Sequence, residues 1–156
     1  MKLIVAAVSA RPPSWIQEGW AEYSRRLPRE CPLLLHEIRP APRKSGKSPA
    51  QLMEAEASGL RAVTPKGAFT IALDERGHDM STADISQHMA AWRQAGRDIV
   101  FLIGGPDGLH ADIKAQADAR WRLSSLTLPH PLVRIVLAEQ LYRAWSLLNN
   151  HPYHRA

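Results

Sequence analysis

The stretch Ile99-Val100-Phe101-Leu102-Ile103-Gly104-Gly105-Pro106-Asp107-Gly108 joins a wholly apolar run to a loop rich in glycine. An uninterrupted apolar run of this length is typical of a strand that is covered on both faces, as in a parallel sheet. Glycines directly after a strand let the backbone approach a ligand closely, although a tight turn without a ligand uses the same residues. The stretch therefore predicts a buried strand with a candidate binding loop at its carboxyl end.

Short apolar runs and amphipathic segments alternate along the rest of the chain. Strands are expected at 3–8, 33–38, 69–73, 99–103 and 121–123. Helices are expected at about 15–27, 49–62, 82–96, 109–118 and 131–148. This alternation predicts an α/β fold with a parallel sheet. We expect one domain over residues 1–156, because this length suffices for a single hydrophobic core.

Two of the helices begin with recognisable caps. Ser48-Pro49-Ala50-Gln51 places serine at the N-cap, proline at the first helical position and glutamine where it completes a capping box. Ser81-Thr82-Ala83-Asp84 resembles a second cap, and Gly96 is a suitable end for the helix that follows. These signals fix the starts of two helices more firmly than hydrophobic periodicity alone.

Composition points to a basic protein of a reducing compartment. The net charge is +5 and the pI is about 9.8, which favours a polyanionic partner such as nucleic acid, although many basic proteins bind none. Cys31 is the only cysteine, so no disulfide forms within the chain, and we expect an inert packed thiol and a cytoplasmic location. The longest apolar runs are too short to span a bilayer, so no membrane partner is expected.

The segment 39–48 differs from the rest because it is basic and rich in proline. It holds Arg39, Arg43, Lys44 and Lys47 and no acidic residue. Two interpretations stay open: a solvated connector, or an arm whose Arg43, Lys44 and Lys47 contact RNA phosphates.

Three predicted strands end in segments that could build a ligand site, namely 73–77, 103–108 and 123–128. Open α/β sheets bind ligands beyond the carboxyl ends of their strands. Dinucleotide and polyphosphate loops are both missing, because Ser9-Ala10-Arg11-Pro12-Pro13 follows the first strand and Pro106 lacks an amide donor. No G-x-S-x-G elbow is present either. A metal site is not expected, since His151 and His154 share a short tail without an obvious third ligand.

Four motifs, taken together, carry a resemblance to a known family. They are Leu102-Ile-Gly-Gly-Pro-Asp-Gly108, Leu123-Ser-Ser-Leu-Thr-Leu-Pro-His-Pro-Leu-Val-Arg134, Glu139-Gln-Leu-Tyr-Arg-Ala-Trp145 and Asn150-His-Pro-Tyr-His-Arg155. With these motifs, and in its length and opening residues, the chain resembles the SPOUT class of RNA methyltransferases. Within that class it is most similar to the RlmH family, which methylates N3 of a pseudouridine in bacterial large-subunit ribosomal RNA.

The resemblance implies a parallel-sheet fold with a C-terminal trefoil knot that binds S-adenosylmethionine. The cofactor-binding residues implied by the motifs are Leu73, Gly104, Gly105, Leu123, Ser124, Ser125, Leu126, Thr127 and Leu128. It also implies a homodimer in which the tail of one subunit lies near the cofactor of the other. The last helix agrees with a dimer, because its apolar residues cover more than one face. The resemblance implies no added RNA-binding domain, so the dimer itself is expected to bind the ribosome.

The C-terminal tail supplies candidates for catalysis, because the imide proton at N3 must leave before or during methyl transfer. We expect His154 to accept the proton, Arg155 to stabilise the anionic base, and Tyr153 to stack on the base or hydrogen-bond to it. His130 and Arg134 are alternatives for these roles, and Arg134 is also a candidate RNA contact.

Three other functions remain open from the sequence. The first is a non-catalytic RNA-binding or ribosome-assembly protein, for which the tail residues serve only as contacts. The second is a methyltransferase of the same class that acts on transfer RNA, although such enzymes usually need additional RNA-binding elements. The third is an α/β enzyme for a small molecule, which the basic charge and the missing nucleotide loops disfavour.

Overall fold

The computed structural model describes residues 1–44 and 46–154. Its strands are β1 (Leu3–Val8), β2 (Leu33–Ile38), β3 (Phe69–Asp79), β4 (Ile99–Ile103) and β5 (Ala119–Arg122). Its helices are α1 (Ser14–Ser24), α2 (Pro49–Val63), α3 (Thr82–Ala95), α4 (Ala111–Gln116), α5 (His130–Leu148) and the short 3-10 helix η1 (Pro152–His154). The elements alternate along the chain as the sequence predicts.

The strands form one parallel sheet in the order β2-β1-β4-β3-β5. The predicted strand Ile99–Ile103 lies at its centre, with Ile99 level with Leu3 of β1 on one side and with Phe69 of β3 on the other. The prediction of an α/β fold with a parallel sheet is therefore confirmed. Because all strands run in one direction, the loops after β1, β3 and β4 emerge at the same edge of the sheet.

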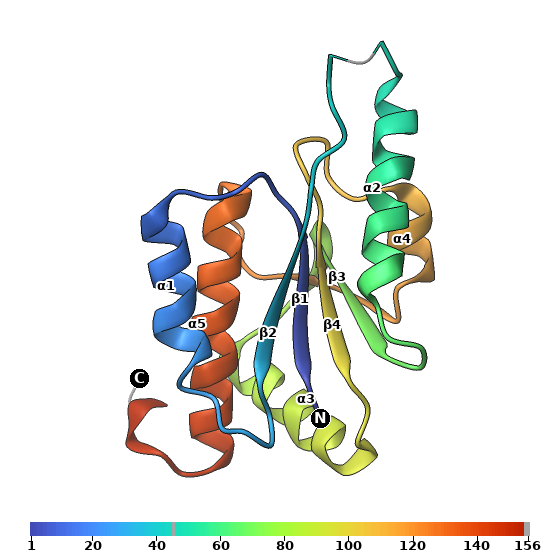
Figure 1. Ribbon diagram of the computed structural model, residues 1–156. Helices are drawn as coiled ribbons and strands as arrows, with labels where there is room; N and C mark the ends of the chain where they lie inside the picture. Colours follow the sequence, from blue (N-terminus) through green and yellow to red (C-terminus); the bar gives the residue numbers. More distant parts are fainter. Residues whose placement is uncertain (45, 155–156) are drawn as a thin grey trace.

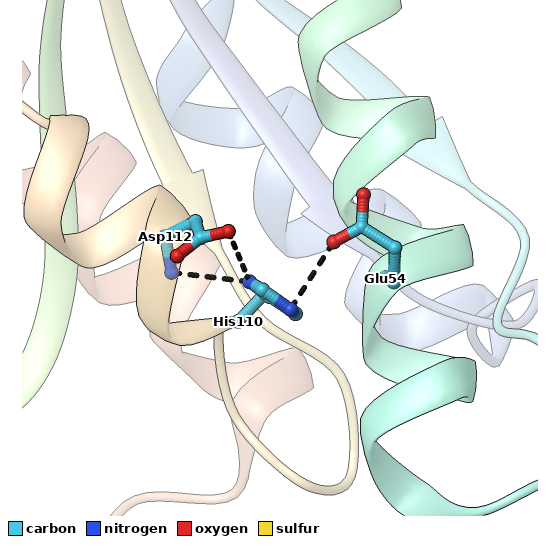
Figure 2. Close-up of side chains that lie close together, drawn as sticks. All are labelled: Glu54, His110 and Asp112. Carbon is cyan, nitrogen blue, oxygen red and sulfur yellow. Dashed lines mark hydrogen bonds and ion pairs between the residues drawn. The ribbon is translucent and has the colours of Figure 1, made fainter.

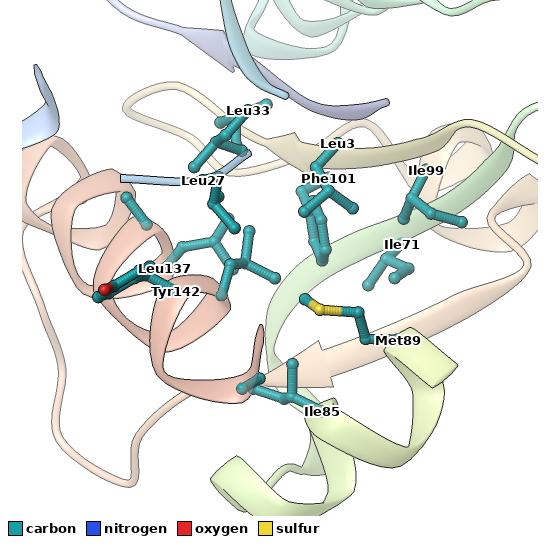
Figure 3. Packing of buried hydrophobic residues seen from close by; sticks show 14 of the residues in the cluster. Leu3, Leu27, Leu33, Ile71, Ile85, Met89, Ile99, Phe101, Leu137 and Tyr142 are labelled. Atoms are coloured by element: carbon teal, nitrogen blue, oxygen red, sulfur yellow. The ribbon is translucent and has the colours of Figure 1, made fainter. Parts of the chain in front are cut away.

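Helices cover both faces of the sheet, with α1, α3 and α5 on one side and α2 and α4 on the other (Figure 1). Alternate residues of β1 serve the two faces: Leu3 and Val5 join the core under α3 and α5, whereas Ile4 and Ala6 join the core under α2. Figure 3 shows the larger core, in which Phe101 of β4 packs among residues of neighbouring elements. Two covered faces explain why these strands are apolar throughout.

The two predicted capping boxes form. In α2 the Ser48 hydroxyl accepts from the Gln51 amide at 3.2 Å, and the Gln51 side chain accepts from the Ser48 amide at 3.0 Å. In α3 the reciprocal pair is Ser81 and Asp84, at 3.0 and 2.9 Å. Gly96 ends α3 in the left-handed region, with φ of 68°. These local signals act as the sequence predicts.

Strand β3 differs from the prediction, because it continues past Leu73 to Asp79. Its pairing with β5 is interrupted between Leu73 and His78, so the residues between them bulge away from β5. Gly77 permits the close return, since a Cβ there would lie 2.6 Å from the backbone carbonyl carbon of Trp121. The polar sequence after Leu73 is typical of a turn, and only the contact with β5 makes the second half extended.

Within residues 1–44 and 46–154, the helices are all too short or too polar to cross a membrane.

Candidate functional site

A pocket of about 710 Å³ lies at the carboxyl end of β4 and beside the bulged middle of β3. It is lined by three segments, 73–76 after the first half of β3, 103–109 after β4, and 121–128 at and after β5, together with side chains of α4 and α5. All nine predicted cofactor residues line it, because the parallel strands bring their following loops to one edge. Whether they bind a cofactor stays a prediction.

The glycine loop is both a tight turn and a wall of this pocket, so the two interpretations of its sequence are compatible. The Gly108 amide donates to the Gly105 carbonyl at 3.0 Å, and Gly108 has φ of 80°. A Cβ on Gly104 would lie 2.4 Å from the carbonyl carbon of Gly108. A Cβ on Gly105 would lie 2.9 Å from Cγ1 of Val8. The backbone itself therefore forms this wall.

Charges of both signs surround the pocket. Its acidic residues are Asp74, Glu75 and Asp107, and its basic residues are Arg76, Lys114 and Arg122. Arg122 is already paired with Asp79: its Nε donates to Oδ1 at 2.5 Å and its Nη2 donates to Oδ2 at 2.8 Å. Nζ of Lys114 lies 3.9 Å from Oδ2 of Asp74. A balanced lining suits a ligand that carries both charges better than a polyphosphate.

His130, at the start of α5, also lines the pocket. Its Nδ1 is buried and has no hydrogen-bond partner within the described part of the chain. Burial, and then the charge of Arg134, lower the pKa of the His130 imidazole below its usual value. At neutral pH this side chain is therefore an uncharged imidazole, which can accept a proton.

Arg134 lies one turn further along α5, and it is almost completely buried. Its side chain is only 1% exposed, and Nη1 donates to Oε1 of Glu37 at 3.3 Å. Its Nε and Nη2 are buried and, among the described residues, have no partner. A side chain with so little exposed surface does not present its charge to solvent in this arrangement, and the RNA contact of Arg134 stays a prediction. The sequence does not reveal this burial, because arginine is rarely buried.

The predicted catalytic tail folds back on α5. The Tyr153 hydroxyl donates to Oε1 of Glu139 at 3.0 Å, and its ring lies 4.6 Å from that of Tyr142, centroid to centroid. Burial, and then the hydrogen bond to Glu139, raise the pKa of Tyr153 above its usual value. Nδ1 of His154 is buried without a partner among the described residues, and the predicted residue Arg155 lies outside them.

Residues 149–154 follow the last residue of α5, whereas the pocket-lining loop 123–128 precedes its first residue, so the two segments lie at opposite ends of the helix (Figure 1). The helix has 19 residues and is therefore about 28 Å long at 1.5 Å per residue. Tyr153 and His154 thus do not reach the pocket of their own chain. Among the catalytic candidates that the structure describes, only the alternative His130 lines the pocket together with the predicted cofactor residues.

The basic segment is partly bound to the fold. Nη1 of Arg43 contacts Oε2 of Glu56 at 2.8 Å, and its Nη2 lies 3.1 Å from Oδ2 of Asp107. Arg43 is therefore engaged in ion pairs, whereas Lys44 and Lys47 are exposed and accessible to RNA. Glu56 was not predicted as a functional residue. The available signal was its place on the apolar face of α2, four residues after Leu52 and four before Leu60.

Glu54, His110 and Asp112 also gather close together, although no metal site is predicted (Figure 2). Nδ1 of His110 accepts from the Asp112 amide at 3.0 Å and caps α4, and its Nε2 lies 3.1 Å from Oε2 of Glu54 on α2. Nδ1 thus caps α4, Nε2 joins α4 to α2, and the two carboxylates are exposed. The cluster has a structural role in this arrangement.

Comparison with known proteins gives a consistent result. The family model described as "Predicted SPOUT methyltransferase" matches residues 1–154. The protein named ribosomal RNA large subunit methyltransferase H of Bordetella avium (strain 197N) is 60% identical over the whole of both chains. The protein of the same name from Burkholderia cenocepacia (strain HI2424) is 52% identical, again over both full lengths.

A solved structure shares the fold. It is described as a probable methylase family protein from Haemophilus influenzae Rd KW20, with a TM-score of 0.56 and 12% sequence identity. The match covers 99% of this chain and 70% of the other. At this identity the likeness concerns the arrangement of the backbone only.

Proposed function

Because the chain belongs to the SPOUT methyltransferase family, we propose that it methylates N3 of a pseudouridine in large-subunit ribosomal RNA, with S-adenosylmethionine as donor. The observation that carries the proposal is the identity of 60% over the full length with a relative named for methylation of that RNA. The pocket supports it, because its lining includes all nine residues that the resemblance implies for donor binding.

The residues present fit S-adenosylmethionine. Leu73, Leu123 and Leu128 offer apolar surface to an adenine ring, and the glycine loop offers backbone groups without intervening side chains. The mixed charges suit an amino-acid group and a sulfonium, and Pro106 withholds one donor that a polyphosphate would need. When bound, the donor supplies an activated methyl group. The pocket's task is to hold that group in line with N3, because good positioning can lower the barrier by roughly 7–11 kcal/mol.

We extend the proposal to a trefoil knot in the C-terminal half. It is supported by membership of the family and by the course of the chain after β5. Residues 123–128 follow β5 at one edge of the sheet and line the pocket beside the glycine loop. The chain then enters α5, which packs against α1 and α3 on one face. A knotted segment would hold the loop 123–128 firmly in place around the donor.

Two histidines are candidates for taking the N3 proton. His130 lies in the pocket of the same subunit, its lowered pKa favours the unprotonated imidazole, and its Nδ1 has no partner among the described residues. His154 reaches a pocket only if a second subunit presents it. Tyr153 keeps its proton at neutral pH, which suits stacking or hydrogen-bond donation to the base. Arg155 remains the proposed cation for the anionic base.

We also propose a homodimer that acts in the cytoplasm on the ribosome. Leu132, Ile135 and Val136 of α5 remain partly exposed in one chain and supply apolar surface for a partner. Within a dimer, the tail of one subunit can reach the pocket of the other, although it cannot reach its own. The net charge of +5 and the exposed Lys44 and Lys47 suit phosphate contacts.

Mapping of modified nucleotides in a deletion strain tests the function. We expect one N3-methylated pseudouridine to disappear from large-subunit RNA and to return when the gene is restored. Purified protein should then methylate ribosomes from the deletion strain with S-adenosylmethionine as donor. Unchanged ribosomal RNA would contradict the proposal, and a methyl group lost from transfer RNA instead would redirect it to that substrate. Calorimetry with the donor separates the enzyme from a non-catalytic RNA-binding protein.

A further inference from the structure

The guanidinium of Arg43 contacts both Glu56 and Asp107, which lie 51 residues apart in the sequence. One terminal nitrogen, Nη1, donates to Oε2 of Glu56 and to the carbonyl of Ala41, both at 2.8 Å. The other, Nη2, lies 3.1 Å from Oδ2 of Asp107. The three charged side chains therefore form a continuous bridge from α2, through the basic segment, to the glycine loop.

Glu56 is the fixed end of this bridge. It is only 3% exposed, although carboxylates are seldom buried without a specific partner. Its Oε2 also accepts from the Ala41 amide at 3.0 Å, so it holds the backbone of the basic segment as well as Arg43. Its Oε1 faces Gly105, at 3.3 Å from where a Cβ of that residue would be. Glu56 thus contacts both of the segments that the bridge connects.

Asp107 is the end that reaches the pocket. It belongs to the loop 103–109 that lines the proposed donor site, and its side chain is partly exposed, at 42%. Directly after Arg43 come Lys44 and, three residues later, Lys47, which are both exposed and are proposed to contact RNA. The bridge therefore connects the glycine loop of the proposed donor site to the basic segment that is proposed to contact RNA.

We propose that Glu56, Arg43 and Asp107 are positioning residues that couple occupancy of the donor pocket to RNA binding. This inference rests on the proposed function. A bound donor holds the glycine loop, and through Asp107 and Arg43 it also holds the basic segment. RNA then binds a segment that is already ordered and loses less conformational entropy on binding. Coupling between sites is reciprocal, so bound RNA strengthens donor binding by the same factor.

The fork of the arginine side chain is essential to this bridge. A guanidinium presents separate donors to Glu56 and to Asp107, whereas the compact ammonium of lysine forms a single point of charge. Arg43→Lys therefore keeps the charge that an RNA phosphate would attract but loses the span between the carboxylates. Asp107→Asn keeps Arg43 and its buried partner and removes only the charge on the loop.

The experiment measures the affinity for ribosomes from a strain that lacks the modification, with and without saturating S-adenosylhomocysteine, which occupies the donor site without reaction. For the unaltered protein we expect S-adenosylhomocysteine to raise the affinity for ribosomes about two- to five-fold. This range corresponds to the contribution of a partly exposed ion pair. In Arg43→Lys and in Asp107→Asn this ratio should fall to about one. Glu54→Gln is the matched control, because Glu54 lies on the same helix, is exposed and is outside the bridge.

The outcomes separate the inference from the proposed function. If S-adenosylhomocysteine does not bind the unaltered protein at all, the proposed function fails. If it binds but the ratio for ribosomes is one, or if the ratio in both variants equals that of the unaltered protein, the coupling is refuted. A ratio that survives in Arg43→Lys but not in Asp107→Asn also overturns the bridge, because charge without the fork would then be sufficient. Unfolding temperatures of the variants show that each remains folded.

Discussion

Gly104 is the residue at which the pocket tolerates least change. An added Cβ would meet the carbonyl carbon of Gly108 and the amide nitrogen of Leu109, at 2.4 and 2.5 Å. Both are backbone atoms, so no side-chain rotation can relieve the contact. The turn from Gly105 to Gly108 would have to open, and the wall of the pocket would move with it. A substitution at Gly104 should therefore disturb the pocket as well as lower the stability of the fold.

Gly104→Ala should lower the free energy of unfolding by about 1–3 kcal/mol, the usual cost of overpacking, and should weaken donor binding at least ten-fold. Urea unfolding and calorimetry with S-adenosylmethionine measure the two effects. Gly19→Ala is the control: its Cβ would lie 2.7 Å from Cδ1 of Ile135, the movable end of a side chain, and alanine favours the helix. Equal donor affinity in the two variants would show that the glycine loop does not hold the donor.

At the scale of elements, the ion pair of Glu37 and Arg134 joins β2 to α5, and it is unusual because the arginine is buried. Arg134 is buried with two unpartnered nitrogens in the described part of the chain, and Glu37 is its counter-charge, 34% exposed. Removing one partner of such a pair leaves a buried charge, whereas an apolar replacement of the buried member relieves it. The two substitutions should therefore differ in effect, although both break the same contact.

Glu37→Gln should lower the free energy of unfolding by about 1–3 kcal/mol, and Arg134→Met should change it by less than about 1 kcal/mol. Urea unfolding at neutral pH measures both, with Glu18→Gln on the exposed side of α1 as the control for a lost carboxylate. A larger loss in Arg134→Met than in Glu37→Gln would refute this account of the pair. Methyl transfer by folded Arg134→Met tests the alternative catalytic role of Arg134.

Local patterns predicted most elements, and failures occurred where distant contacts decide. The strand Ile99–Ile103 and the capped start of α2 follow from neighbouring residues alone. The extension of β3 beyond Leu73 depends on β5, which the sequence near Leu73 does not contain. For the same reason the motifs indicated the pocket residues, whereas the burial of Arg134 and the distance from the tail to the pocket follow only from how α5 packs.

At the scale of the whole molecule, the proposed chemistry is divided between two ends. The pocket opens at the start of α5, and η1, which holds Tyr153 and His154, packs against its other end. Residues 149–154 fold back on α5 rather than extending toward the pocket, with Tyr153 held by Glu139 and by the ring of Tyr142. We therefore propose that the site is assembled from two subunits, with the tail of each beside the pocket of the other.

Mixing two inactive variants tests this arrangement. Leu126→Glu places a charge in the loop 123–128 at a side chain that is 73% exposed, so it should damage donor binding without unfolding the chain. His154→Ala removes the tail histidine. When the two are unfolded together and refolded in equal amounts, half of the dimers should be mixed, and each contains one undamaged pocket served by one undamaged tail. Methyl transfer should then return to about one quarter of the unaltered level, because half of the dimers are mixed and one of the two sites in each is intact.

Each variant refolded alone is the control. If the mixture is no more active than the separate variants, the tail does not act across the dimer, and His130 becomes the proton acceptor to test.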